Sequence, residues 1–177
     1  MVLLRKKERK FESKKSMSEV SREIILYHRS QEIVDSPEIR IAKYHKDFYY
    51  GFYCTLIPEQ VKRWAVRYKG QGIVNEYLYT PDRTLKTLVF SEMTEEWLDF
   101  IVASRNGNSH NYDIVEGPMA NDTIFNYIQN FVDGKISRAA FWELAKFKKP
   151  THQISFHTAK SLESLQFLKA YEVYDEE

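Results

Sequence analysis

The sequence predicts a single mixed α+β domain, and three observations support this prediction. Short segments with alternating apolar residues, typical of β-strands, are interspersed with segments whose apolar residues recur at helical spacing. The chain has 177 residues, a length that suits one domain. Its hydrophobic fraction of 43% lies near the globular norm, so the chain has enough apolar surface to form a core.

Seven segments have the pattern of short strands. The first, residues 23–28, has four consecutive apolar residues and ends in a polar residue, as expected for a buried strand. In the second, residues 51–56, the alternation places Phe52, Cys54 and Leu56 on one face and Tyr53 and Thr55 on the other. The remaining candidates are residues 73–79, 85–90, 112–118, 153–157 and 171–174.

Five helices are predicted from start signals followed by apolar residues at helical spacing. Their start signals are Pro58 in a first turn and the N-cap residues Thr94, Asn121, Ser137 and Thr158. Gly134 is expected to end the third helix, and Pro150 to break the chain after the fourth. The last helix is expected to carry Leu162, Leu165 and Leu168 on its inner face.

Composition and charge exclude several classes of protein. The net charge of +1 favours neither nucleic acid nor an anionic membrane surface, and no apolar run approaches the ~20 residues that span a bilayer. The single cysteine, Cys54, cannot form an internal disulfide, so a cytoplasmic, reducing compartment is expected. Residues 1–20 are expected to form a basic, flexible leader before a domain at 21–177, with Met17 as an alternative start.

Motifs for several common chemistries are absent from the sequence. The six glycines form no phosphate-binding loop, and no nucleophile elbow occurs. His152 and His157 lie five apart on a strand, on opposite faces, so no metal site is expected. Cys54 is expected on the core side of its strand, where it would be a poor nucleophile.

The aromatic stretch Lys46–Thr55 is the first candidate for a ligand-binding surface. Five aromatic residues fall within six positions, interrupted only by Gly51. Tyr53 would present a ring on the face away from the core, and Gly51 leaves space for a planar ligand to approach the backbone. The alternative is an aromatic-rich buried strand with a structural role alone.

Three short segments combine a histidine, a tyrosine and a glutamine at strand ends. They are Leu-Tyr-His-Arg-Ser at residues 26–30, Gly-Phe-Tyr-Cys-Thr at 51–55 and His-Gln-Ile-Ser-Phe at 152–156. In order and approximate spacing they resemble three motifs of the ADP-ribosyltransferase superfamily, in its diphtheria-toxin and poly(ADP-ribose) polymerase branch. Those motifs read Leu-Tyr/Phe-His-Gly-Ser, Gly-x-Tyr-Phe-x and Asn-Glu-Tyr-x-x, and they supply a His-Tyr-Glu triad.

The chain also resembles a bacterial family known as domain of unknown function 3990, which is grouped with the ADP-ribosyltransferases. Two further features recur there: Tyr-Asp-Ile-Val-x-Gly-Pro-x-Ala-Asn-Asp, here residues 112–122, and Phe-His-Thr after the third motif. The resemblance covers roughly residues 24–169. It implies a split β-sheet core with flanking helices, and mono-ADP-ribosyltransferase activity with NAD as the substrate and no metal.

The resemblance also implies roles for individual residues. His28 would hydrogen-bond a ribose hydroxyl, Tyr53 would stack on the nicotinamide ring, and Gln153 would lie near the bond that breaks. The backbone of Arg29 would hold the nicotinamide carboxamide. The residues expected to contact NAD are His28, Arg29, Ser30, Gly51, Tyr53 and Thr55.

Two positions depart from the motifs. Arg29 replaces a glycine, so its side chain must leave the pocket. Gln153 replaces the catalytic glutamate; its amide oxygen still accepts a hydrogen bond but carries no charge. The sequence therefore implies a slow enzyme, a different acceptor chemistry, or a carboxylate supplied from elsewhere. Asp113, Glu116 and Asp122 are the candidates for that carboxylate, although each also has a structural reading as a solvated residue or a helix-terminal charge.

The sequence is compatible with three functions. The first is transfer of ADP-ribose to a protein or nucleic-acid acceptor, by a cytoplasmic bacterial toxin neutralised by a small antitoxin protein. The second is a module that binds NAD or an ADP-ribose-like ligand without turnover, which the glutamine at position 153 favours. The third is a nucleic-acid-processing relative that uses the basic leader and residues 146–149 as contacts.

Overall fold

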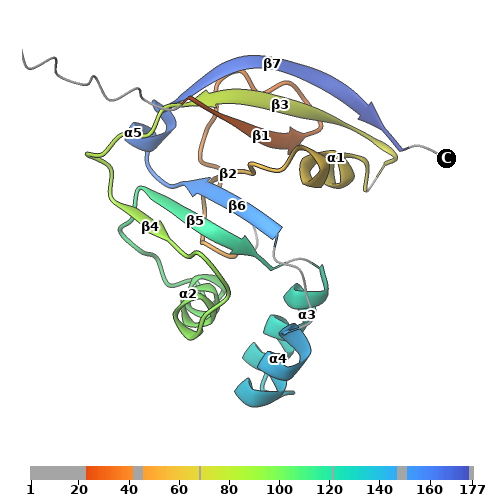
Figure 1. The fold of residues 1–177 in the computed structure, drawn as a ribbon, viewed down its shortest axis with the longest axis vertical. Helices are drawn as coiled ribbons and strands as arrows, with labels where there is room; N and C mark the ends of the chain where they lie inside the picture. Colours follow the sequence, from red (N-terminus) through yellow and green to blue (C-terminus); the bar gives the residue numbers. More distant parts are fainter. Residues whose placement is uncertain (1–22, 42–45, 68, 121, 147–150, 176–177) are drawn as a thin grey trace, which may run out of the picture.

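The computed structural model describes residues 23–41, 46–67, 69–120, 122–146 and 151–175 (Figure 1). The expected leader and the predicted signals Met17, Asn121 and Pro150 lie outside these residues. The described elements are β1 (Ile24–Ser30), β2 (Phe52–Cys54), α1 (Pro58–Val66), β3 (Gln71–Tyr79), β4 (Thr87–Val89), α2 (Glu95–Arg105), β5 (Ile114–Met119), α3 (Asp122–Val132), α4 (Arg138–Ala145), β6 (Thr151–Phe156), α5 (Ala159–Leu162) and β7 (Leu165–Tyr174). The prediction of a mixed α+β domain is therefore confirmed.

The strands form two sheets that lie one above the other in Figure 1. The three-stranded sheet has the order β1-β3-β7 and is antiparallel throughout. The four-stranded sheet has the order β2-β6-β5-β4, with β4 parallel to β5. A bridge between Tyr27 and Thr55 joins β1 to β2, because each backbone N–H donates to the other residue's carbonyl at 2.9 Å. The two sheets thus meet along a seam between these strands.

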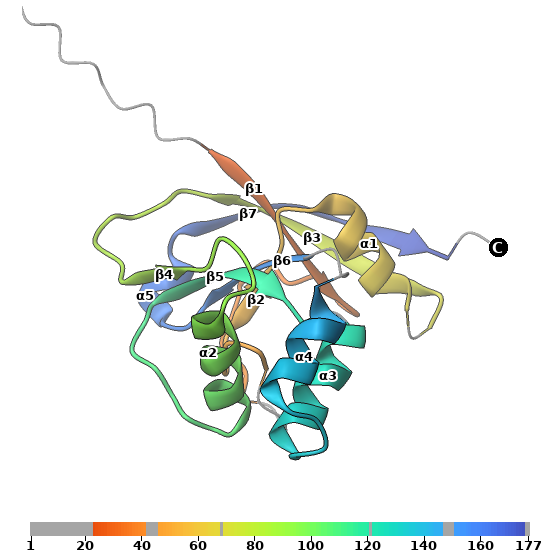
Figure 2. The same ribbon diagram turned by 60° about the horizontal axis from the view of Figure 1, so that its bottom comes forward.

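Two main hydrophobic cores lie on opposite faces of the four-stranded sheet. The inter-sheet core contains Leu26, Phe52 and Cys54, while Tyr53 packs against the second core. That second core is built by α2, α3 and α4, which gather on one side of the sheet (Figure 2). The predicted alternation is confirmed for Phe52, Tyr53 and Cys54, but the strand ends at Cys54 and Leu56, predicted on the core face, is 41% exposed. Burial raises the pKa of the Cys54 thiol.

Helix starts follow the predicted signals where these residues are described. The Thr94 hydroxyl accepts a hydrogen bond from Trp97 N at 3.3 Å, and Ser137 accepts one from Ala140 N at 3.1 Å. Pro58 occupies the first helical position of α1, where its missing N–H costs nothing. None of the described helices is long and apolar enough to cross a membrane.

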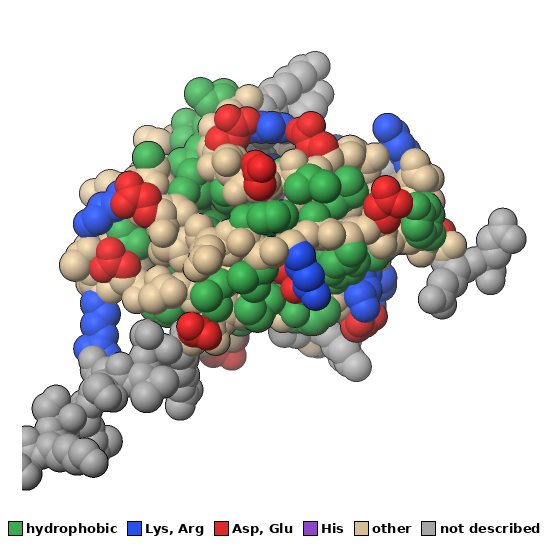
Figure 3. Space-filling model, turned by 90° about the horizontal axis from the view of Figure 1, so that it is seen from above, with side chains coloured by type: hydrophobic (Ala, Val, Ile, Leu, Met, Phe, Trp, Pro, Cys, Tyr) green, Lys and Arg blue, Asp and Glu red, His purple; other side chains and the backbone are tan. Residues whose placement is uncertain are grey.

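The prediction for the last helix is wrong. Thr158 does cap a helix, but α5 ends at Leu162, and the long strand β7 begins at Leu165. Leu168 lies on β7 and is 44% exposed. Leu165 and Phe167 face the inter-sheet core with strand alternation, and the pairing of nine β7 residues with β3 stabilises the extended form. Seen from above, the surface of the molecule carries hydrophobic and charged side chains interspersed (Figure 3).

Candidate functional site

His28 lies near the end of β1, beside the seam between the two sheets. Its Nδ1 is 2.7 Å from the carbonyl oxygen of Tyr53, and its ring stacks on Phe52 with a centroid distance of 4.2 Å. Because a carbonyl only accepts, Nδ1 must carry the proton. Burial lowers the pKa of His28 to about 4, so at neutral pH the ring is uncharged and Nε2 has a lone pair. No described residue hydrogen-bonds this Nε2, which is therefore an available acceptor.

Tyr53 projects from the other face of β2, toward the helices. Its hydroxyl donates to the carbonyl of Tyr49 at 2.7 Å and accepts from the N–H of Phe48 at 3.0 Å. Burial raises the pKa of this phenol, so it stays neutral. The ammonium of Lys46 lies 4.5 Å from the ring centroid, over the ring face. The Tyr53 ring is thus held at its hydroxyl end and already has a cation on its π-face.

Gln153 lies on β6, on the same face of the sheet as Tyr53. Tyr53 pairs with Ser155, so Gln153 is its diagonal neighbour, a relationship that puts the two residues about 7–8 Å apart and their Cβ atoms somewhat closer. The side chain is buried, and Nε2 donates to Asp47 Oδ2 at 3.1 Å and to the carbonyl of Pro118 at 3.4 Å. With both amide hydrogens used, Oε1 is an acceptor that takes no hydrogen bond from the described residues.

Asp47 is the carboxylate next to Gln153. One of its oxygens accepts from Arg105 Nε at 3.1 Å and Nη2 at 2.5 Å, and the other accepts from Ala120 N at 3.0 Å as well as from Gln153. The Arg105 and Asp47 side chains are only 6% and 9% exposed. A buried, hydrogen-bonded ion pair therefore fixes the orientation of the Gln153 amide.

A comparison with known protein families matches residues 24–167 to a family described as "Protein of unknown function (DUF3990)". The chain belongs to the DUF3990 family. The matched region begins with β1 and ends inside β7, so it includes both sheets together with His28, Tyr53 and Gln153. No curated protein is similar enough to the chain to count as a match.

The three residues predicted as catalytic occupy two faces of the DUF3990 domain. Tyr53 and Gln153 share the helix-facing side of the four-stranded sheet. His28 binds the backbone of Tyr53, but its ring lies on the inter-sheet side, against Phe52. The backbone of β2 therefore separates the imidazole from the phenol, while the tip of each side chain has a fixed orientation.

The structure gives Gly51 a different neighbour from the one that the sequence suggested. A Cβ on Gly51 would lie 2.9 Å from Cε1 and Nδ1 of His157 and from the carbonyl oxygen of Phe156. The planar group against this backbone is thus the protein's own imidazole. His157 Nδ1 is also 2.7 Å from the carbonyl of Tyr50, and its Nε2 is 2.7 Å from Ser155 Oγ.

The other residues predicted to contact NAD have mostly internal partners. Thr55 is fully buried, and its hydroxyl accepts hydrogen bonds from Ile57 N and Gln60 Nε2, both at 3.1 Å. Ser30 Oγ accepts from Asn75 Nδ2 at 2.9 Å. By strand alternation, the Arg29 side chain points to the face of β1 opposite His28.

The acids that were candidates to assist Gln153 are engaged elsewhere. Asp113 accepts from Lys86 N at 2.8 Å and from Thr158 Oγ1 at 2.7 Å, and these bonds lower the pKa of its carboxyl. Glu116 pairs with His152 on the inter-sheet face, and the side chain of Asp122 lies outside the described part of the chain. Among the described residues, no three His, Cys, Asp or Glu side chains are grouped to hold a metal ion.

Sequence reasoning missed Asp47, Arg105 and Lys46 as site residues. Asp47 and Lys46 stand in the aromatic stretch itself, and an acid between residues that form a core is a signal of a buried ion pair. Nothing local identifies Arg105, which is the last residue of α2.

Proposed function

We propose that this DUF3990 protein is an NAD-dependent mono-ADP-ribosyltransferase whose acceptor is a protein or a nucleic acid. The observation that carries the proposal is the state of His28: a neutral ring, fixed by the Tyr53 carbonyl, with an available acceptor at Nε2. The ribose of NAD offers hydroxyl donors to such an acceptor. The Oε1 of Gln153 is a second acceptor of the same kind, because its own amide hydrogens are used by Asp47 and Pro118.

The reaction asks little acid–base chemistry of the protein. The bond between ribose C1′ and the nicotinamide nitrogen breaks, and its electron pair neutralises the positively charged ring. The acceptor nucleophile forms the new bond to C1′ and gives its proton to solvent. The protein must bind the ribose hydroxyls, hold the nicotinamide ring and orient the acceptor, which are positioning tasks suited to hydrogen bonds and ring contacts.

The contact between Lys46 and Tyr53 supports the nicotinamide role of this tyrosine. An electron-rich ring face that attracts an ammonium also attracts the positively charged nicotinamide ring of NAD. In this proposal the nicotinamide takes the place of Lys46 over the Tyr53 ring. The exposed Lys46 side chain can move into solvent when that happens.

The network around Gln153 makes the proposed enzyme slow. The charge of Asp47 is neutralised by Arg105, so Asp47 orients the amide and does not replace the missing carboxylate. Loss of one charged contact to a transition state commonly costs on the order of 10²–10³ in rate. We therefore propose turnover about that much below an enzyme with glutamate at this position.

The test is release of nicotinamide and labelling of an acceptor by NAD carrying a label on its adenosine part. We expect the wild-type chain to show both, and His28→Ala to lose both. Tyr53→Leu removes the aromatic ring and should therefore lose activity. Tyr53→Phe retains the ring and should keep most of the activity. Unchanged product formation in His28→Ala and Tyr53→Leu would reject the site.

A second candidate function is NAD or ADP-ribose binding without turnover. The burial of Gln153, only 4% exposed, favours it, because a side chain held inside has little contact with a bound ribose. Calorimetry that detects NAD binding without nicotinamide release would favour this module. Release that disappears in Gln153→Ala, with binding retained, would favour the transferase.

The resemblance described above extends the first proposal to a bacterial toxin acting in the cytoplasm and neutralised by a small protein. Expression in a bacterial host provides the test. We expect growth arrest with the wild-type chain and growth with His28→Ala, and the growth difference should disappear when the neutralising protein is present.

A further inference from the structure

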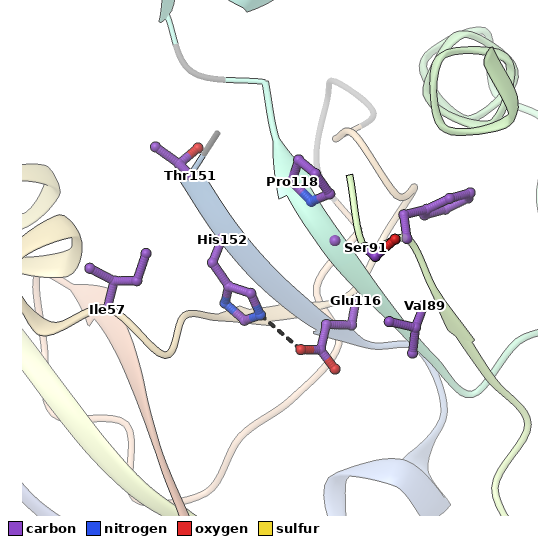
Figure 4. A pocket seen from close by; sticks show the side chains of 9 residues that line it. Ile57, Val89, Ser91, Glu116, Pro118, Thr151 and His152 are labelled. Carbon is purple, nitrogen blue, oxygen red and sulfur yellow. Dashed lines mark hydrogen bonds and ion pairs between the residues drawn. The ribbon is translucent and has the colours of Figure 1, made fainter. Parts of the chain in front are cut away.

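A cavity of about 290 Å³ opens at the end of the inter-sheet layer that lies far from His28. Figure 4 shows its arrangement: Glu116 and His152 approach each other in the middle, with Val89 on one side and Ile57 on the other. Phe52, which carries the His28 ring, pairs with Phe156, four residues along β6 from His152. Four strand residues span about 13 Å, so the cavity is separate from His28. Gln153 is adjacent to His152 in sequence, but strand alternation puts its side chain on the opposite face of the sheet from the cavity.

His152 holds the Glu116 carboxylate in this cavity. Its Nδ1 is 3.2 Å from the N–H of Leu56, which can only donate, so Nδ1 is the acceptor. The proton of the neutral ring is therefore on Nε2, and it is donated to Glu116 Oε1 at 2.9 Å. Both ring nitrogens are thus used within the protein. His152 has no lone pair left for a substrate proton, so the pair is built for binding and not for acid–base catalysis.

The Glu116 carboxylate is the charged group of the cavity. Its side chain is 31% exposed, and its second oxygen accepts no hydrogen bond from the described residues. No lysine or arginine among those residues forms an ion pair with it. The walls beside it are apolar, formed by Ile57, Val89 and Pro118. A single fixed acid between apolar walls selects a cation attached to an apolar stem.

The rim of the cavity is also apolar and exposed. Two of its lining residues, Ile57 and Val89, are 38% and 58% exposed, and Leu56, the neighbour of Ile57 in sequence, is 41% exposed. Exposed aliphatic residues around a pocket that contains one charged group are typical of a site where a partner protein inserts an anchor side chain. The volume lies just below the range for small-molecule sites, about 300–1,000 Å³, and suits one side chain better than a nucleotide.

We propose that this cavity binds an arginine side chain of a partner protein, with its guanidinium on Glu116 and its three methylenes between Ile57 and Val89. Arginine fits better than lysine for two reasons. The guanidinium is less strongly hydrated than an ammonium, so apolar walls disfavour it less, and its planar set of N–H donors matches the geometry of a carboxylate such as Glu116. The proposal does not depend on NAD turnover.

The test uses the full chain and blocked tripeptides of the form Gly-X-Gly, in which X is arginine, citrulline, lysine or leucine. Citrulline has the shape of arginine without its charge, so it isolates the contribution of the cation. Binding is followed by amide NMR on isotope-labelled protein, with the Leu56 amide as reporter because it bonds His152. We expect the arginine peptide to shift this signal and to bind about tenfold or more tightly than the citrulline peptide.

Three variants sharpen the test. Glu116→Gln keeps the shape and should remove the preference for arginine over citrulline, whereas Glu92→Gln makes the same charge change at an exposed residue that does not line the cavity and should leave it intact. Val89→Thr changes an exposed wall residue without threatening the fold and should weaken the arginine peptide several-fold. Equal binding of arginine and citrulline, tighter binding of lysine or leucine, no shift at Leu56, or an unchanged preference in Glu116→Gln would each overturn the proposal.

Discussion

A 2.7 Å hydrogen bond from the His28 ring to the main-chain carbonyl of Tyr53 determines which nitrogen of that ring carries its proton. The bond assigns Nδ1 as the donor and Nε2 as the acceptor in the neutral ring. It also ties β1 to the edge strand β2, next to the backbone bridge between Tyr27 and Thr55. One ring nitrogen, Nδ1, therefore has a structural role, and the other, Nε2, is available to a ligand. A substitution can remove the second role while keeping the first.

Replacing His28 with asparagine separates the two roles. An asparagine Nδ2 stands close to the position of the imidazole Nδ1 and can still donate to the Tyr53 carbonyl, but nothing replaces the acceptor at Nε2. We expect His28→Asn to fold, with a modest loss from the missing stack on Phe52. Nicotinamide release should fall by about 10²-fold. Thermal unfolding and product assays on one preparation check this, and a folded variant with full activity would contradict it.

The ion pair of Asp47 and Arg105 predicts an energetic coupling to position 153. Gln153→Glu would put a second carboxylate against Asp47 in a buried site, and Asp47→Asn would leave Arg105 without its charge partner. We expect Asp47→Asn to cost about 3–5 kcal/mol and Gln153→Glu about 1–3 kcal/mol in the free energy of unfolding.

The double variant Asp47→Asn with Gln153→Glu restores one negative charge beside Arg105. It should be more stable than the sum of the single changes predicts, by at least about 1 kcal/mol. Urea unfolding of the four proteins measures this coupling. Additive effects would show that Asp47 does not orient the side chain at position 153.

The Lys46 ammonium over Tyr53 predicts a competition with the nicotinamide ring. Lys46→Met keeps most of the stem but removes the charge, so NAD would meet an unoccupied ring face. A cation–π contact at a partly exposed site contributes about 0.5–2 kcal/mol, which corresponds to roughly 2- to 30-fold tighter NAD binding. Lys169→Met is the matched control, because Lys169 lies over Tyr171 in the other sheet. Weaker NAD binding in Lys46→Met alone would mean that Lys46 helps to bind NAD.

Local patterns predicted the features that depend on neighbouring residues. The two-residue period of residues 51–56 placed Cys54 in the core and Tyr53 on the other face, as the structure has them. The caps at Thr94 and Ser137 were correct because a capping hydroxyl bonds an N–H only three residues away. These interactions lie within one short window of sequence.

The features that failed depend on distant partners. The spacing of Leu162, Leu165 and Leu168 fits a helix, but the pairing of β7 with β3 decides in favour of a strand. Asp47 meets Arg105 and Gln153, which are 58 and 106 positions away, so no local pattern reveals their network. The space over Gly51 is filled by His157, which likewise comes from a distant strand end. A site assembled from several elements is therefore only partly visible in one sequence.

Tyr49 provides a prediction about backbone strain beside the site. Its φ of 72° is positive, which is uncommon for a residue with a side chain, and its carbonyl accepts the Tyr53 hydroxyl. Asparagine tolerates this conformation, whereas valine, branched at Cβ, does not. Tyr49→Asn and Tyr49→Val both lose the ring contacts, so the difference between them reports the backbone. We expect Tyr49→Val to be less stable by about 1–2 kcal/mol in urea unfolding, and equal stability would contradict this.

Two buried histidines predict how stability depends on pH. Burial lowers the pKa of both His28 and His157 to about 4, from the ordinary value of about 6.5 for a histidine in an unfolded chain. Between these values the unfolded state binds more protons than the folded state, so the free energy of unfolding falls as pH decreases. The stabilisation is complete above about pH 6.5 and is lost progressively down to about pH 4, on the order of 3 kcal/mol per histidine.

The window from pH 6.5 to 5 is the best place to measure this effect, because most carboxylates stay ionised there. Urea unfolding at half-unit steps should give a slope of about two protons or more for the wild-type chain, because burial also lowers the pKa of His110. His157→Gln should reduce the slope by about one proton, and so should His28→Asn, while His152→Gln serves as the control. His152 contacts neither His28 nor His157, and its ring nitrogens are bonded to Leu56 N and the Glu116 carboxylate. A wild-type slope near zero would mean that His28 and His157 have the same pKa in the folded and the unfolded chain. The His28 ring would then be protonated at mildly acidic pH, which contradicts the neutral ring proposed for ligand binding.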